Sequence, residues 1–218
     1  MLIFTIFFAL LSIFHLYTCY FRIEGLRRLT KPLLLLSLAL FYFFFAENAS
    51  YLVFAALLCG MIGDTFLLWQ EKEGLFITGA VVFAIGHVLY SMELLHMAAG
   101  LAWWIIPIIA LPYAVVIAFE CIKVSPKEKY FRALMPVYLG MVAVLSFAAW
   151  ANLISCIRAG APAFAASVIV LGSVCFFVSD SILASSIFRN NIKHANFYVM
   201  MTYIAAQACL AAGFMMAA

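Results

Sequence analysis

Long apolar segments alternate with short polar stretches along the whole chain. About eight apolar segments follow one another, and the stretches between them hold most of the charged residues. Within a segment the apolar residues run continuously instead of alternating with polar ones, which is typical of membrane-spanning helices and not of barrel strands. The pattern therefore predicts an all-α fold, a polytopic membrane helical bundle of about eight transmembrane helices of roughly 20 residues each.

The expected spans are 1–21, 32–46, 51–69, 75–97, 103–122, 133–150, 162–185 and 196–216. The second span is short, and we expect it to take in residues from its flanks. All connections are brief, and no change in composition marks a linker or a soluble domain. We therefore expect residues 1–218 to form a single transmembrane helical domain.

Composition excludes several other classes of protein. Hydrophobic residues make up 69% of the 218 residues and charged residues only 10%, with a mean hydropathy of +1.18. A soluble domain is about a quarter charged, so this chain has too few polar side chains to cover a water-facing surface. Twelve Lys and Arg against nine Asp and Glu leave a formal charge of only +3, which argues against a nucleic-acid partner. The lipid bilayer is the expected environment.

The basic residues predict the orientation. Eleven of the twelve Lys and Arg lie in the first, third, fifth and seventh loops, and only Arg158 lies on the other side. The positive-inside rule then places those loops in the cytoplasm and both termini outside it. The first span has no basic segment before it, unlike a signal peptide, so we expect an anchor. The small size and short loops favour a bacterial inner membrane.

Two spans carry related short segments. Residues 63–69 of the third span read GDTFLLW, and residues 179–185 of the seventh read SDSILAS, each with an Asp three residues before a Leu. The two spans are four apart and run in the same direction. This spacing permits a 4+4 internal repeat around a shared central site.

The only two aspartates of the chain, Asp64 and Asp180, lie in these segments. An Asp at the centre of a membrane helix costs roughly 2.5–3.5 kcal/mol on insertion scales, so such residues usually face the bundle interior and mark function. Each lies about five residues from the cytoplasmic end of its span, or roughly 7–8 Å below that boundary. We expect one shared site near the cytoplasmic leaflet. The alternative is a structural role, with each acid paired to a Lys or Arg.

Other polar residues within the spans complete the candidate site. They are Lys31, His87, Tyr90, Tyr138, Tyr203 and Gln207. Lys31 is expected to open the second span, with Pro32 in its first turn. The pairs 87/90 and 203/207 each share a helix face because their members are about one turn apart. Each also has a structural alternative. Lys31 could only set the topology, the tyrosines could be packing residues, Gln207 could join helices by hydrogen bonds, and His87 could be a hydrogen-bonded core residue.

A metal site is the other chemistry that these residues permit. His87, Asp64 and Asp180 could supply the three ligands of a catalytic zinc, but no spacing motif such as His-Glu-x-x-His is present. The six cysteines form no Cys-x-x-Cys pattern. We expect no metal and no cofactor.

Five motifs occur in a fixed order along the chain: KP at 31–32, GDTFLLW at 63–69, GHVLY at 86–90, SDSILA at 179–184 and YIAAQ at 203–207. Together they resemble the YhhN-type lysoplasmalogenase family of integral membrane proteins over nearly the whole chain. The resemblance implies hydrolysis of the vinyl ether bond of lysoplasmalogens to a fatty aldehyde and glycerophosphoethanolamine or glycerophosphocholine. Carried over by motif, it implies site roles for Lys31, Asp64, His87, Tyr90, Asp180, Tyr203 and Gln207.

The chemistry of vinyl ether hydrolysis suits paired carboxyls. Protonation of the alkene carbon remote from oxygen gives an oxocarbenium ion, to which water adds. This requires one protonated carboxyl and one ionised group nearby, and burial with like-charge repulsion keeps neighbouring carboxyls from both ionising. We therefore expect Asp64 and Asp180 to be the acid/base pair, and His87 or a tyrosine to orient the water or shuttle its proton. Lys31, with Arg189 or Lys193, would hold the phosphate.

Two other classes of function stay open. Paired intramembrane carboxylates near a His and a Lys also describe a proton-coupled transporter of a small or lipid-like solute. Against a transporter, the spans have few central Gly or Pro breaks apart from Pro107 and Pro112 in the fifth. A non-catalytic lipid-binding or scaffold protein would tolerate substitution of both aspartates. The family resemblance favours the enzyme, with a lysophospholipid substrate.

Overall fold

The computed structural model describes residues 1–69, 71–98, 104–124, 129–189 and 192–217, with the side chains of 123, 124, 129–134, 188 and 189 left out. Its elements are α1 Leu2–Tyr20, α2 Glu24–Phe45, α3 Tyr51–Phe66, η1 Leu67–Trp69, α4 Glu73–Met97, α5 Ile105–Val124, α6 Lys129–Ala159, α7 Phe164–Arg189 and α8 Ala195–Ala217. Within the described residues, eight helices are long and apolar enough to cross a membrane. The predicted all-α membrane bundle is confirmed, and the chain is an integral membrane protein.

The start of the second helix differs from the prediction. We expected Lys31 to open the span with Pro32 in its first turn, but α2 begins at Glu24 and Pro32 lies inside the helix. Charged residues at helical spacing extend the helix out of the apolar run, and Arg27 bonds Glu24 three residues earlier. Pro32 cannot donate a hydrogen bond to the carbonyl of Arg28, so it costs the helix one internal bond. Lys31 therefore projects from the second turn of a helix already formed.

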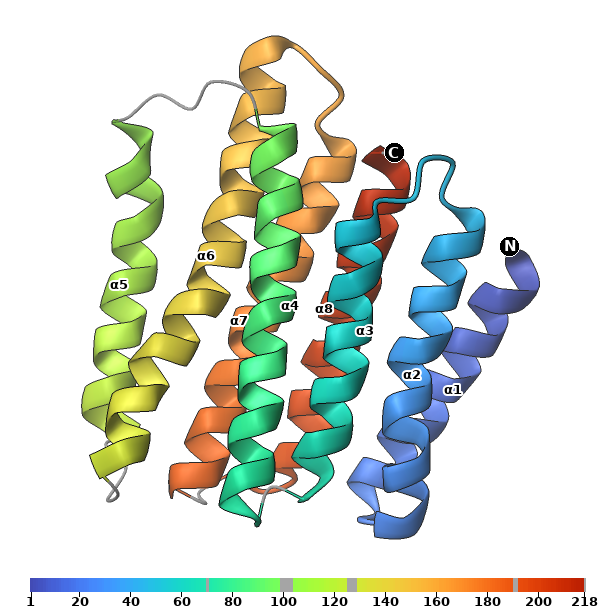
Figure 1. The fold of residues 1–218 in the computed structure, drawn as a ribbon, viewed down its shortest axis with the longest axis vertical. Helices are drawn as coiled ribbons and strands as arrows, with labels where there is room; N and C mark the ends of the chain where they lie inside the picture. Colours follow the sequence, from blue (N-terminus) through green and yellow to red (C-terminus); the bar gives the residue numbers. More distant parts are fainter. Residues whose placement is uncertain (70, 99–103, 125–128, 190–191, 218) are drawn as a thin grey trace.

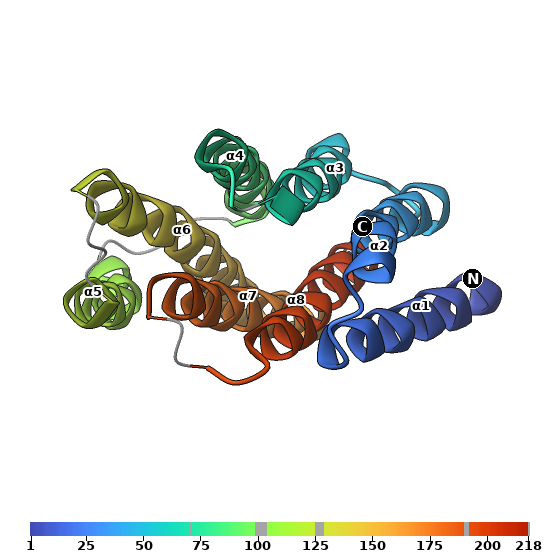
Figure 2. The ribbon, with the colours of Figure 1, turned by 90° about the horizontal axis from the view of Figure 1, so that it is seen from below.

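The helices form two facing groups (Figures 1 and 2). The pair α3 and α4 faces α7 and α8, while α6 runs alongside and α1 and α5 lie at opposite flanks. Only 11% of the α5 span is buried, against 50–56% for α6, α7 and α8, so the core lies between the latter and α3–α4. Both termini lie at the same end of the bundle.

Helix neighbours in the two halves of the chain correspond. The pairs α1–α2, α2–α3 and α3–α4 pack together, and so do α5–α6, α6–α7 and α7–α8. The two halves meet through α4 against α6 and through α8 against both α1 and α2. The α4–α6 and α8–α2 pairs are related by a shift of four helices, whereas α1–α8 and α5–α7 have no comparable counterpart in the part of the chain that the structure describes. Part of the helix arrangement matches the 4+4 repeat that the two Asp segments permit, and that repeat stays a prediction.

Helices α7 and α8 form the most extensive helix pair among the described residues, and Gly172 lies at their contact. A Cβ added at Gly172 would lie 2.9 Å from the carbonyl oxygen of Ala206 and 2.9 Å from the backbone nitrogen of Leu210. Small residues let helix backbones approach closely in membranes, where packing and not water exclusion drives helix association. This contact fixes α8, and with it Tyr203 and Gln207, against α7.

The substitution Gly172→Ala is expected to lower the thermal unfolding midpoint in detergent, because the new methyl group meets backbone atoms that cannot move aside. Gly140→Ala on α6 is the matched control, since a Cβ there meets nothing within 4 Å. In the control the methyl group adds only helix propensity, worth up to about 1 kcal/mol, so stability should be unchanged or slightly higher. Equal midpoints for the two variants would contradict the role of Gly172.

Candidate active site

Asp64 is held by two partners from different helices. Its Oδ1 lies 2.9 Å from Nζ of Lys31 on α2, and the hydroxyl of Tyr203 on α8 donates to its Oδ2 over 2.8 Å. The Asp64 residue is only 2% exposed. A buried carboxylate is stable when it is both ion-paired and hydrogen-bonded, so these contacts favour the ionised form of Asp64. Each carboxylate oxygen has one partner, and the ion pair joins α2 to α3.

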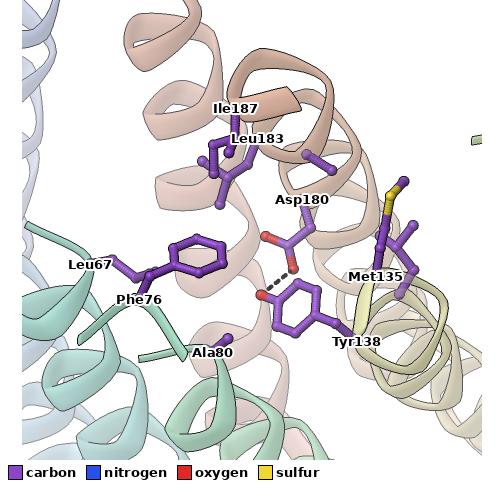
Figure 3. Close-up of a pocket in the computed structure, with 10 residues that line it drawn as sticks. Leu67, Phe76, Ala80, Met135, Tyr138, Asp180, Leu183 and Ile187 are labelled. Carbon is purple, nitrogen blue, oxygen red and sulfur yellow. Dashed lines mark hydrogen bonds between the residues drawn. The ribbon is translucent and has the colours of Figure 1, made fainter. Parts of the chain in front are cut away.

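Asp180 lies in different surroundings. Its Oδ2 accepts a hydrogen bond of 3.1 Å from the Tyr138 hydroxyl on α6, and Asp180 is 5% exposed (Figure 3). Among the described side chains, no Lys, Arg or His forms an ion pair with it. A buried carboxyl with a neutral hydrogen-bond donor and no cation is most stable when it carries its proton. The two acids are therefore chemically unlike.

Both acids line one pocket of about 590 Å³ together with Lys31, Tyr138 and Tyr203. We call this the acid pocket. It lies at the end of the bundle opposite the termini, because Lys31 and Tyr203 are early in their helices and Asp64 is near the end of α3. Helix α7 runs to Arg189, four residues beyond the predicted end of the seventh span, so Asp180 lies further from its helix end than predicted. Asp180 nevertheless lines the same pocket as Asp64.

An apolar cavity of about 540 Å³ adjoins the acid pocket (Figure 3). The two share six lining residues, which are Leu67, Phe76, Tyr138, Asp180, Leu183 and Ile187. The remaining lining of the cavity, which includes Met135 and Ala80, is apolar. Asp180 and Tyr138 thus lie at a boundary between a charged compartment and a hydrocarbon-like one.

Tyr90 and Gln207 support the acid pocket from behind. The Tyr90 hydroxyl donates to Oε1 of Gln207 over 3.0 Å, and Gln207 is also a hydrogen-bond partner of Tyr203. Tyr203 in turn donates to Asp64. Tyr90 and Gln207 line a smaller cavity of about 180 Å³ and not the acid pocket, so the structure gives them contact with Asp64 only through Tyr203.

His87 also faces the smaller cavity and does not line the acid pocket. Its Nδ1 lies 2.7 Å from the Phe83 carbonyl oxygen, so Nδ1 carries a proton and donates it there. Its Nε2 is buried without a hydrogen-bond partner among the described residues. The ring packs edge-to-face on Phe176, with centroids 4.5 Å apart. The structure thus separates His87 from the two acids with which the sequence grouped it.

The phosphate-binding residues suggested by the sequence have unlike positions. The ammonium of Lys31 is engaged by Asp64. Lys193 is exposed and does not line the acid pocket, and the side chain of Arg189 lies outside the described residues. The pocket instead contains Arg27 and Asn196, which sequence reasoning missed. The available signal was the four-residue spacing from Arg27 to Lys31, which has meaning only if α2 begins before Arg27.

The acid pocket offers two carboxyls to a cation but no third ligand of the usual kind. Within the described residues, no group of three His, Cys, Asp or Glu side chains could hold a metal ion. All six cysteines are free thiols. The chemistry available to the pocket's own side chains is therefore proton transfer and charge stabilisation.

Comparison with known proteins agrees with the geometry. Residues 26–214 match the model of the YhhN family. The chain belongs to the YhhN family. Among curated relatives, the human lysoplasmalogenase TMEM86A is 28% identical over 174 residues, which cover 78% of this chain and 67% of the relative. The human lysoplasmalogenase TMEM86B is 29% identical over 185 residues, covering 82% and 71%.

A pig lysoplasmalogenase TMEM86B is 31% identical over 154 residues, which cover 70% of this chain and 58% of the relative. Across these three relatives, the alignments span 58–71% of the relatives' own lengths. No solved structure matches the chain. The YhhN match includes every residue assigned above to the acid pocket and its supports.

Removal of one partner of the ion pair is expected to destabilise the protein. Lys31→Met leaves a buried carboxylate without its cation, at a cost of about 3–5 kcal/mol, and the double variant Lys31→Met/Asp64→Asn should recover most of that loss. Thermal unfolding in detergent measures both. Lys193→Met, which removes the same charge at an exposed position, is the matched control and should leave stability unchanged. Additive losses in the double variant would argue against the pairing.

Proposed function

We propose that this protein is a lysoplasmalogenase, which hydrolyses the vinyl ether bond of lysoplasmenyl-ethanolamine or lysoplasmenyl-choline to a fatty aldehyde and the glycerophospho-head group. The observation that carries the proposal is the pair of buried aspartates in one pocket, of which Asp64 is ion-paired and Asp180 is not. The lysoplasmalogenase names of the relatives support it. No cofactor is required, because the reaction needs only proton transfer and water.

The unlike surroundings of the two acids suggest their roles. Asp180 is the proton donor, because it has no cation partner and lies where the polar and apolar compartments meet. Asp64 is the ionised partner, because the Lys31 ammonium and the Tyr203 hydroxyl stabilise its charge. Two carboxyls whose environments favour opposite protonation states can divide the roles of proton donor and charge-stabilising carboxylate between them.

The reaction then proceeds in three steps. Asp180 donates its proton to the alkene carbon remote from oxygen, the π electrons form the new C–H bond, and the carbon attached to oxygen becomes part of an oxocarbenium ion. The nearby Asp64 carboxylate stabilises the positive charge. Water adds to that carbon and returns a proton to Asp180. The resulting hemiacetal collapses, its hydroxyl proton passes to the glyceryl oxygen, and aldehyde and alcohol leave.

Tyr138 and Tyr203 act as positioning residues for the two acids. Each donates one hydrogen bond to its aspartate, and each projects from a helix other than the one that bears that aspartate. Tyr90 and Gln207 hold the Tyr203 hydroxyl through the contacts described above. His87 stands outside the acid pocket, so a role in moving the proton of the attacking water would need a water molecule between them.

The apolar cavity suggests how the lipid tail lies. At Ala80 and Tyr138 it adjoins an apolar groove between α4 and α6. The other lining residues of the groove are Val81, Ala84, Ile85, Val88 and Leu89 of α4 and Val137 and Met141 of α6. Val81 and Val137, which are 49% and 56% exposed, open the groove to the side of the bundle that would face lipid. Ten helical residues cover roughly 14 Å, enough for much of an alkenyl chain.

The basic residues near the acid pocket suggest its orientation in the membrane. The pocket lies at the end of the bundle that holds Arg27 and Lys31, near the start of α2. The positive-inside rule assigns that end to the cytoplasm. We therefore propose that both termini lie outside the cytoplasm and that the substrate comes from the cytoplasmic leaflet. There its ether bond would lie just below the head group.

The decisive assay is aldehyde release by the detergent-solubilised protein from a lysoplasmenyl phospholipid, with the matching saturated alkyl-ether lysolipid as the unreactive control. Asp180→Asn and Asp64→Asn should each lower kcat by about 10²–10⁴-fold, the usual contribution of a positioned acid or base. Thr65→Val is the matched control, because the Thr65 hydroxyl is bonded within its own helix to the Met61 carbonyl.

In deuterated water the aldehyde should carry deuterium at the carbon next to the carbonyl, since that carbon receives the proton from Asp180. Full activity of either correctly folded Asn variant would refute the acid/base assignment. Folded wild-type protein that releases no aldehyde from any head group would refute the lysoplasmalogenase proposal, and proton-coupled flux in liposomes would then test the transporter.

The tail position gives a chain-length prediction. Ala84→Phe places a ring in the groove between α4 and α6 and should lower kcat/KM roughly tenfold for long alkenyl chains, with little effect on short ones, because only long chains reach that depth. Ala118→Phe, the same change at an exposed position on α5, should affect neither. Equal losses for long and short chains would place the tail elsewhere.

A further inference from the structure

Arg27 is a cation in the acid pocket that the proposed reaction does not use. It lines the pocket one helical turn before Lys31, and its side chain is 16% exposed. Its Nε and Nη2 bond one carboxylate oxygen of Glu24 at 3.1 and 2.6 Å. A guanidinium has five N–H donors, so three remain without a partner among the described residues. Arg27 can therefore bind a second anion.

Glu24 does not compete strongly for Arg27. The Glu24 side chain is 51% exposed and does not line the acid pocket. Because the Glu24 carboxylate is half exposed to solvent, its attraction for Arg27 is screened and weak. The contact uses two of the five donors, and Arg27 lines the acid pocket with the others unpaired among the described residues.

Lys31 cannot serve as the main anion-binding residue, although it lies in the same pocket. Its ammonium is 2.9 Å from Asp64. If Lys31 turned away to bind an external anion, the buried Asp64 carboxylate would lose its compensating charge. Asn196, near the start of α8, also lines the pocket and adds a neutral amide donor. The combination of a guanidinium with free donors and an amide is typical of sites for phosphate oxygens.

We propose that Arg27, assisted by Asn196, forms a subsite for the phosphodiester of the lipid head group. The spacing agrees with the proposed reaction, on which this inference rests. Five bonds separate the phosphorus from the ether oxygen of the glycerol, or roughly 6 Å at bond lengths near 1.5 Å. One helical turn from Arg27 to Lys31 is about 5.4 Å. A phosphate on Arg27 thus brings the ether oxygen to the level of the Lys31–Asp64 pair.

The test compares two substrates that differ only in the phosphate: a lysoplasmenyl phospholipid and the matching 1-alkenylglycerol. In Arg27→Gln, kcat/KM for the phospholipid should fall about 10- to 100-fold, mainly through KM, because hydrogen bonds between charged groups are lost. The kinetics of the alkenylglycerol should stay unchanged. Arg27→Lys keeps the charge and should recover part of the loss.

Two variants serve as controls. Arg28→Gln removes the same charge at the adjacent, exposed position outside the pocket and should leave the phospholipid kinetics unchanged. Glu24→Gln removes the helix-internal partner and should not lower the preference for the phospholipid. Equal losses of both substrates in Arg27→Gln would overturn the subsite, and so would an Arg28→Gln effect as large as that of Arg27→Gln.

A binding experiment separates this proposal from the reaction itself. The unreactive alkyl-ether lysophospholipid should raise the thermal unfolding midpoint of the wild type more than the matching alkylglycerol, and Arg27→Gln should abolish that difference. This outcome would support the subsite even if no aldehyde were released, in which case only the proposed function would fail. Equal stabilisation of the wild type by both lipids, or equal stabilisation by inorganic phosphate alone, would overturn the assignment to a lipid head group.

Discussion

The ion pair between Lys31 and Asp64 is the contact on which the rest of the site depends. Asp64 could not stay ionised at this depth without a cation, and Lys31 could not be buried without an anion. The pair joins α2 to α3, and Tyr203 adds α8 to the same carboxylate. Asp180 then differs from Asp64 because no such cation reaches it among the described side chains. This one ion pair thereby favours the ionised form of Asp64, whereas Asp180, which lacks such a partner, is more stable with its proton.

The arrangement of polar and apolar space follows from the same contact. Charged groups gather on the α2 and α3 side of the acid pocket, whereas α4, α6 and α7 contribute mainly apolar side chains on the other side. Asp180 and Tyr138 line both spaces. Under the proposed function, the head group would lie on the charged side and the tail on the apolar side, with Asp180 between them.

The sequence alone predicted the number and type of the helices, because continuous apolar runs of this length have few other solutions in a membrane. It was less accurate where a helix leaves the bilayer. The polar first turns of α2 look like a loop, so Lys31 was placed at a helix start and Arg27 was overlooked. A search for apolar runs does not detect an amphipathic first turn of a helix. The four-residue spacing between Arg27 and Lys31 was the feature that could have placed the start of α2 before Arg27.

Side-chain grouping was predicted only in part. Asp64, Asp180, Lys31, Tyr138 and Tyr203 do line one pocket. His87 was grouped with them because it lies at a similar depth in the membrane. Depth alone does not indicate which neighbouring helix a side chain faces. The neighbour of each helix face is decided by packing between helices, here by Gly63, Gly86 and the aromatic rings between α3, α4 and α7. Such packing is a property of helix pairs and cannot be derived from single spans.

The predicted 4+4 repeat would have a consequence for the partners of the two acids. Asp64 on α3 takes its partner Lys31 from the preceding helix α2, and Asp180 on α7 takes Tyr138 from the preceding helix α6. These helix pairs are equivalent under the shift by four. Two identical halves would have given two equal acids and no division of labour. In a duplicated bundle, a lysine beside one acid and a tyrosine beside the other would be sufficient to keep the first ionised and the second protonated. The difference between the acids would then lie in their partners and not in the acids themselves.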